Sequence, residues 1–175
     1  GKCKLKQALI KHKKYPELCL LPSAQTRDKD AVTAEQMKEL VEELKKDFDY
    51  ILLDCMSSLG MITMNALVAS DSVIIPVQCE FFALEGITQL LNSIIMVQSS
   101  MNPNLKIEGV LLTMLDGRTN IGLEVIEEVR KYFRDKVFNT LIPRLVRLVE
   151  APSHGKPINE YDPTSRATEA YANLA

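Results

Sequence analysis

The hydrophobic positions along the chain alternate between short continuous runs and longer stretches in which apolar residues recur every three or four positions. The continuous runs have the length and composition of buried strands and occupy 18–22, 50–53, 72–77, 107–114 and 137–142. The stretches with helical spacing lie at 2–13, 33–48, 59–69, 84–99, 121–133 and 164–175. Strands that are apolar throughout and alternate with helices predict an α/β fold, with a mostly parallel sheet covered by helices on both faces.

Local signals refine this pattern at three places. In the helix expected at 33–48, Thr33 and Gln36 have the spacing of a capping box. Pro76 cannot donate a hydrogen bond to a neighbouring strand, so it is expected at the end of its strand. The segment 143–163 has no regular pattern and is expected to be a loop.

The composition is that of one ordinary globular domain, with 175 residues, of which 46% are hydrophobic and 25% charged. A net charge of −2 excludes binding to nucleic acid through overall charge, so any such site must be a local patch. The lysines near the start of the chain are interpreted as a solvated helix face in preference to a binding tail. The four cysteines are widely spaced, which disfavours a zinc site and a disulfide framework.

Candidate chemistry is expected where the strands end, because ligands of open parallel sheets bind at the carboxyl ends of the strands. Asp54 directly follows the run at 50–53, and a carboxylate in that position can hold Mg²⁺ beside the phosphates of a nucleotide. On this pattern alone, a capping role is the alternative. The loops at 113–118 and 142–144 can form the walls of a base pocket, or can be ordinary turns.

These strand ends resemble those of the ParA/MinD family of partition ATPases. The segment 50–55, with the sequence YILLDC, is similar to the Walker B strand of that family. The segments that resemble ParA of the chromosome-partitioning type are 71–86, 107–120, 142–147 and 150–157. The resemblance covers essentially the whole chain; residues 1–55 look more like MinD, and residues 57–175 look more like ParA.

The resemblance implies a single partial ATPase domain over 1–175, similar to P-loop NTPases of the deviant Walker A class. Asp54 matches the Walker B carboxylate, which also makes it the metal-holding residue. The residues from Ser57 to Gly60 match the switch that senses the γ-phosphate. The residues that match loops enclosing adenine are Met114, Asp116, Pro143 and Arg144.

Two arginines complete the implied site. Arg118 and Arg147 match basic residues that contact non-specific DNA in ParA dimers. Two guanidinium groups in each subunit, doubled by dimerisation, would give several phosphate contacts and a steep dependence of binding on salt. The alternative for each residue is a surface arginine paired with a nearby carboxylate.

At the level of function, the resemblance implies chromosome or plasmid partitioning through ATP-dependent homodimerisation and non-specific DNA binding. ATP and Mg²⁺ are the implied cofactors, a ParB-type protein is the implied partner, and the expected location is cytoplasmic and nucleoid-associated. Membrane binding is not expected, because the amphipathic helix at the carboxyl end of MinD has no counterpart here. The alternatives are a MinD-like division-site regulator that works through protein contacts, and a nucleotide-independent DNA- or partner-binding module.

The sequence departs from the family in one major respect. Family members carry a K-G-G-x-G-K-T loop whose backbone amides and lysines hold the phosphates, and this motif does not occur in the 175 residues. We therefore expect the first strand and the P-loop to be absent, ATP binding to be weak or absent, and the chain alone not to hydrolyse ATP. Because that strand is central in the family's sheet, the isolated chain is expected to be marginally stable.

Overall fold

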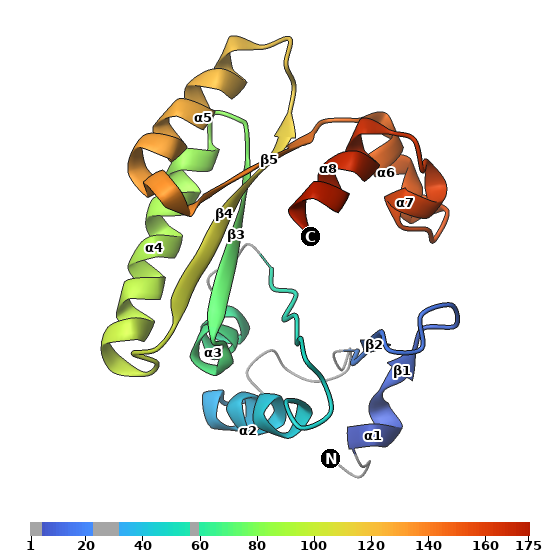
Figure 1. Ribbon diagram of the computed structural model, residues 1–175. Coiled ribbons are helices and arrows are strands. Elements are labelled where there is room, and N and C mark those ends of the chain that lie inside the picture. The colour runs from blue at the N-terminus through green and yellow to red at the C-terminus, as the bar shows by residue number, and fades with distance from the viewer. Residues whose placement is uncertain (1–4, 23–31, 57–59) are drawn as a thin grey trace. The chain divides into compact units, whose positions relative to one another are not determined.

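The computed structural model describes residues 5–22, 32–56 and 60–175 (Figure 1). The chain forms two compact units, Gly1–Val32 and Thr33–Ala175. The first unit is small and the second contains the sheet. The expectation of a single partial domain stays a prediction.

The first unit is built around a short antiparallel hairpin. Helix α1 (Leu5–Ala8) is followed by β1 (Ile10–Lys11) and β2 (Cys19–Leu20), which pair with each other. The predicted helix over 2–13 is wrong after Ala8, where α1 ends, and its residues 2–4 lie outside the described residues. The predicted buried strand at 18–22 is an exposed hairpin strand.

A histidine closes the turn between the two strands of this hairpin. Nδ1 of His12 accepts hydrogen bonds from the backbone N–H groups of Lys14 and Tyr15, at 3.3 and 3.1 Å. The His12 N–H itself donates to the Leu18 carbonyl at 2.8 Å. Such local side-chain bonds offer the backbone an alternative to helix, and here they close a turn.

The second unit begins with helix α2 (Ala34–Leu44), whose amino end has the predicted capping box. Oγ1 of Thr33 accepts from the Gln36 N–H at 3.3 Å, and Oε1 of Gln36 accepts from the Thr33 N–H at 3.1 Å. The side chains of Val41 and Leu44 are buried. Helix α2 packs against α3 (Met61–Ala69).

The sheet consists of three parallel strands in the order β3-β4-β5, namely β3 (Ser72–Gln78), β4 (Lys106–Leu115) and β5 (Val137–Pro143). Helix α4 (Ala83–Ser100) connects the first two strands, and α5 (Asn120–Phe133) with a 3₁₀ turn (Arg134–Lys136) connects the last two. The two helices lie together along the sheet (Figure 1). The predicted α/β fold with a parallel sheet flanked by helices is confirmed.

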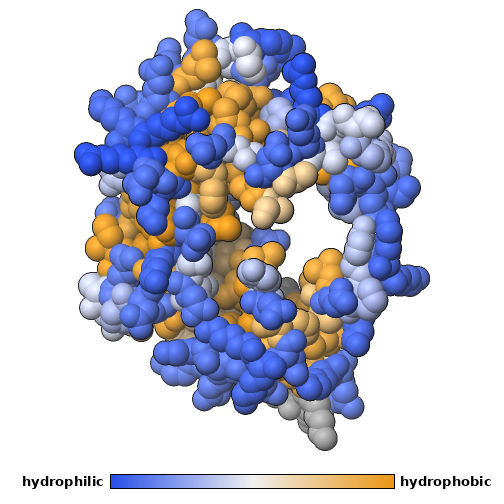
Figure 2. All heavy atoms as spheres, in the orientation of Figure 1, coloured by the Kyte–Doolittle hydropathy of each residue, from blue (hydrophilic) through white to orange (hydrophobic). Residues whose placement is uncertain are grey.

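The core of this unit lies between the sheet and helices α3, α4 and α5. Its most deeply buried side chains come from β3, β4, α4 and α5: Ile75, Val110, Leu112, Ile94, Val97 and Val129. Large hydrophobic side chains also reach the surface, where they form patches between hydrophilic ones (Figure 2). Among the described residues, no helix is both long and apolar enough to cross a membrane.

The run at 50–53 does not form the strand predicted for it. Its backbone has no regular structure, and the side chains of Tyr50 and Leu52 are each 88% exposed. A strand needs a hydrogen-bonding neighbour, and among the described residues no strand pairs with this run. The apolar pattern therefore predicts a strand, but the described residues contain no neighbouring strand that pairs with it.

The expectation that Pro76 ends its strand is also wrong, since β3 continues to Gln78. Pro76 is aligned with Leu111 of β4. In the described residues β3 pairs only with β4 and so lies at the edge of the sheet, the position where a proline is tolerated because its missing N–H disrupts no ladder.

The segment predicted as a loop at 143–163 contains two helices, α6 (Val146–Ser153) and α7 (Ile158–Tyr161). Together with α8 (Arg166–Leu174) they form a second, small core around Ala151, Ile158 and Ala167. Helix α8 also packs against β5. The loop prediction failed because the apolar side chains of these short helices are buried by one another, which no single stretch of sequence reveals.

Asn102 closes the end of helix α3 against the turn after α4. Its Nδ2 donates to the carbonyls of Leu67 and Ser70, at 3.1 and 2.8 Å. Replacing Asn102 with alanine should lower the free energy of unfolding by about 1–3 kcal/mol, because two carbonyls at a helix end lose their donor. Urea unfolding measures this change, and Asn104→Ala in the same turn is the exposed control. Equal effects of the two changes would contradict the capping role.

Candidate functional site

The ends of the three strands meet at one edge of the sheet, which we call the carboxyl edge. It consists of Cys79–Glu80 after β3, the segment 114–118 around the end of β4, and Pro143–Arg144 at the end of β5. The Cys79 N–H donates to the Thr113 carbonyl and the Arg144 N–H donates to the Leu115 carbonyl, both at 2.9 Å. These two hydrogen bonds therefore connect the carboxyl ends of all three strands.

An ion pair crosses the carboxyl edge from one outer strand to the other. Nη1 of Arg144 lies 2.9 Å from Oε1 of Glu80, and about half of each side chain is exposed. Because β4 lies between β3 and β5, this pair spans the end of the central strand. Two exposed aromatic side chains, Phe81 and Phe82, follow Glu80 directly and pack edge to face.

The end of β4 has an unusual backbone. Met114 adopts a φ of 55°, in the left-handed region that side chains other than glycine rarely occupy. Such strain persists only where the surrounding structure enforces it, and it gathers at binding sites. Here it redirects the chain at the point where the predicted adenine-enclosing residues begin.

Asp116 is tied to Arg118 through three hydrogen bonds. Oδ1 accepts from the backbone N–H and from Nε of Arg118, at 3.1 and 2.9 Å, and Oδ2 accepts from Nη2 at 2.7 Å. Hydrogen bonds from the guanidinium and from the backbone N–H, followed by the charges of Arg118 and Arg144, hold the pKa of Asp116 well below its ordinary value. A lowered pKa means that acid opposes the pairing, so Asp116 stays ionised and paired throughout the neutral range.

The two predicted DNA-contacting arginines are both exposed and both paired with carboxylates. The side chain of Arg118 is 88% exposed while it holds Asp116. The side chain of Arg147, on α6, is 58% exposed and lies 3.1 Å from Glu150 and 3.6 Å from Asp162. The pairing that the sequence left open as an alternative is therefore present, and the exposure that a phosphate contact requires is present as well.

The remaining predicted residues lie on the segment before α3. Asp54 is exposed on the irregular stretch that follows 50–53. Gly60 is the N-cap of α3, and Oγ1 of Thr63 donates to the Met56 carbonyl at 3.5 Å across the start of that helix. Ser57 lies outside the described residues. No described contact joins this segment to the carboxyl edge.

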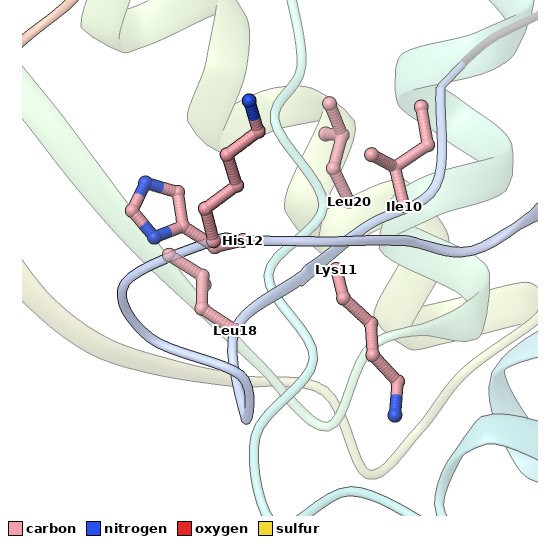
Figure 3. A pocket seen from close by; sticks show the side chains of 6 residues that line it. Ile10, Lys11, His12, Leu18 and Leu20 are labelled. Atoms are coloured by element: carbon pink, nitrogen blue, oxygen red, sulfur yellow. The ribbon is translucent and has the colours of Figure 1, made fainter.

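A shallow hollow lies on the hairpin of the first unit, and Figure 3 shows its side chains coming from both strands. Its lining residues are Ile10, Lys11, His12, Lys13, Leu18 and Leu20. The lining contains one imidazole, His12, and no carboxylate or thiol, and a single imidazole makes neither a metal site nor an acid–base pair. Among the described residues of the chain there is also no cluster of three or more side chains suited to hold a metal ion.

The candidate residues suit some parts of a nucleotide with Mg²⁺ but not all of them. Mg²⁺ is commonly held by only one or two carboxylates while keeping several waters, so the single exposed carboxylate of Asp54 suits it. Met114, which has a left-handed backbone near the end of β4, and Pro143, the last residue of β5, are the residues expected to wall a base. The phosphates need a row of backbone N–H groups or lysines, and the sequence has no glycine-rich motif of that kind.

A parallel sheet flanked by helices, with Asp116 and Arg144 at its carboxyl edge, is an α/β architecture that P-loop NTPases share. The family described as an AAA domain matches residues 2–107. The chain belongs to this family and, within it, to the ParA/MinD group of partition ATPases.

The relatives are bacterial proteins of that group. The sporulation initiation inhibitor protein Soj of Bacillus subtilis is 64% identical over 140 residues, which cover 80% of this chain and 55% of that protein. The chromosome partitioning protein ParA of Myxococcus xanthus is 51% identical over 139 residues, covering 79% of this chain and 49% of that protein. The chain spans about half the length of these curated relatives.

Solved structures agree in fold. Cobyrinic acid a,c-diamide synthase from Mycobacterium smegmatis, with bound ADP and magnesium, is 30% identical with a TM-score of 0.73, covering 95% of this chain and 63% of that one. The cell division ATPase MinD of Pyrococcus furiosus has a TM-score of 0.76 at 22% identity, covering 99% of this chain and 69% of that one. Nucleotide and magnesium binding therefore occurs among the structural relatives of this chain.

Several contacts at the site were not predicted. Glu150 stands three residues after Arg147, a spacing that brings side chains together on a helix, so the sequence held a usable signal for that pair. Glu80 contacts Arg144, and Tyr161 contacts Arg147. In both pairs the two residues lie on different elements of the fold, so their spacing in the sequence gives no signal of the contact.

Proposed function

We propose that the protein is a partition ATPase, acting in chromosome or plasmid partitioning through ATP-dependent dimerisation and non-specific DNA binding. The observation that carries this proposal is the joining of the β4 and β5 ends at the carboxyl edge, which places Asp116 and Arg144 together beside an exposed Arg118. The names of the relatives supply the biological process. A ParB-type partner and association with the nucleoid belong to the same proposal.

In this proposal the residues divide the work of binding. Met114, Asp116, Pro143 and Arg144 enclose the adenine, Asp54 holds Mg²⁺ through water, and Ser57 to Gly60 respond to the γ-phosphate. The phosphates themselves need a loop that the 175 residues do not contain, so these residues alone are not expected to hydrolyse ATP. Asp54→Ala should weaken any binding of a fluorescent ATP analogue that requires Mg²⁺.

Arg118 and Arg147 supply the DNA contacts in the proposal. Each guanidinium is exposed and retains donors beyond those that its carboxylate partner uses. A phosphate on DNA competes with that carboxylate for the guanidinium. Solvent-exposed ion pairs are weak because water screens them, so the competition is one that DNA phosphates can win.

The experiment is a DNA-binding titration with a short duplex of arbitrary sequence, repeated at several salt concentrations, both with and without ATP and Mg²⁺. Arg118→Ala and Arg147→Ala should each weaken binding and lower the slope of log affinity against log salt by about 1. The control is Arg130→Ala, which makes the same change in charge on an exposed position near the far end of α5.

The outcomes separate the candidate functions. Unchanged affinity in both arginine variants would overturn the DNA-binding part of the proposal. Binding that needs these arginines but not ATP would favour the nucleotide-independent binding module instead. Binding to a division-inhibitor protein with no binding to DNA would favour a division-site regulator.

A further inference from the structure

Arg147 is surrounded by side chains from a second element of the small helical core. Tyr161, the last residue of α7, lies with its ring beneath the guanidinium, 5.8 Å from ring centroid to Cζ. Its hydroxyl donates to Oε2 of Glu150 at 3.1 Å, the same oxygen that accepts from Nη1 of Arg147. Asp162, the next residue after Tyr161, lies 3.6 Å from Nε of Arg147.

Tyr161 is itself held firmly in place. Its backbone N–H donates to the Pro157 carbonyl at 3.0 Å, and the Asp162 carbonyl accepts from Oγ1 of Thr168 on α8 at 2.7 Å. The ring packs against the small core and stacks with the ring of His154 at 5.1 Å and 20° between planes. The ring is therefore a fixed platform, and Arg147 is the exposed group that rests on it.

A fixed platform matters because a free arginine side chain has many rotamers, and ordering them on binding weakens affinity. An aromatic face attracts a guanidinium and restricts it without occupying its hydrogen-bond donors. The carboxylates of Glu150 and Asp162, by contrast, occupy donors that a phosphate would use. Of the groups around Arg147, the face of the Tyr161 ring can orient the side chain without using the donors that a phosphate needs.

We propose that Tyr161 is a positioning residue that holds Arg147 ready to contact a nucleic-acid phosphate. This inference rests on the proposed DNA contact of Arg147. It assigns the short α6–α7 region a role in binding: α6 carries the contacting arginine, and α7 carries the ring that orients it.

The test compares Tyr161→Leu with Tyr161→Phe in the same salt-dependent DNA titration, with ATP and Mg²⁺ present. Tyr161→Leu removes the aromatic face and should weaken DNA binding about two- to fivefold, the size of an exposed cation–π contact. Tyr161→Phe keeps the face and should bind as tightly as the unchanged protein. In an Arg147→Ala background, Tyr161→Leu should have no further effect on affinity, since the group that it positions is gone.

Each outcome has a distinct meaning. If Arg147→Ala weakens binding and Tyr161→Leu does not, the positioning role is wrong while the DNA contact stands. If Tyr161→Leu weakens the Arg147→Ala protein by the same factor, Tyr161 acts only through the local fold and the inference is overturned. If Arg147→Ala itself binds normally, the proposed DNA contact fails, and the positioning role fails with it.

Folding is checked by far-ultraviolet circular dichroism and by the urea midpoint of each variant. Should Tyr161→Leu not fold, Tyr161→Met takes its place, because methionine fills irregular core gaps with a flexible, unbranched side chain but offers no aromatic face. The same two- to fivefold loss is expected for it. Binding as tight as that of Tyr161→Phe would overturn the inference.

Discussion

Leu112→Ala should lower the free energy of unfolding by about 2–5 kcal/mol, the range found when a buried leucine is truncated and leaves a cavity. Leu112 is completely buried near the middle of β4, the central strand. It is aligned with Val77 of β3 and Leu141 of β5, so both outer strands lose a packing partner. Such a loss is a large share of the ~5–15 kcal/mol that stabilises a typical domain.

The control for this change is Leu123→Ala on α5, where the leucine side chain is 53% exposed. A surface change of this kind usually alters stability by no more than about 0.5 kcal/mol. Urea unfolding followed by circular dichroism measures both. Similar losses in the two variants would mean that β4 is not the centre of the core.

Gly109→Ala should also destabilise the protein, by about 1–3 kcal/mol, because it forces an extra methyl group into a filled space. A Cβ at Gly109 on β4 would lie 2.5 and 2.6 Å from two ring carbons of Phe138 on β5, closer than any van der Waals contact allows. The ring or the strand must move, and both lie where β4 and β5 pair. Thermal or urea unfolding measures the loss.

The same substitution at a second glycine is expected to stabilise the protein instead. Gly86 lies in helix α4, and a Cβ there would meet nothing within 4 Å. Gly86→Ala should therefore raise stability by up to about 1 kcal/mol through helix propensity. Combining Gly109→Ala with Phe138→Leu should recover part of the first loss by relieving the clash. If Gly109→Ala is instead neutral alone, the ring of Phe138 is free to turn away.

These two positions bear on function through β4. The strand that carries Gly109 and Leu112 includes the strained residue Met114 near its end and is followed directly by the Asp116–Arg118 pair. A site built on the end of a central, buried strand is held more rigidly than one built on a surface loop. Loss of nucleotide or DNA binding in the two core variants would therefore report on the support of the site and not on its chemistry.

Much of the candidate site could be predicted from the sequence because its residues follow buried strands. The runs that became β3, β4 and β5 differ from the observed strands by a residue or two at their ends, and the loops after β4 and β5 do meet at one edge. In a parallel sheet that outcome follows from the alternation of strands and helices alone.

What the sequence determined by itself was local: the α/β alternation, the capping box at Thr33, and the identity of the residues at the strand ends. Tertiary structure decided the rest, because burial and pairing depend on which neighbour is present. An apolar run is a strand only beside another strand, so among the described residues 50–53 stays unpaired and irregular while 72–78 is paired. The contacts of the arginines depend on tertiary structure for the same reason. Glu80 reaches Arg144 only when the strand ends come together, and Tyr161 reaches Arg147 only when the short helices do.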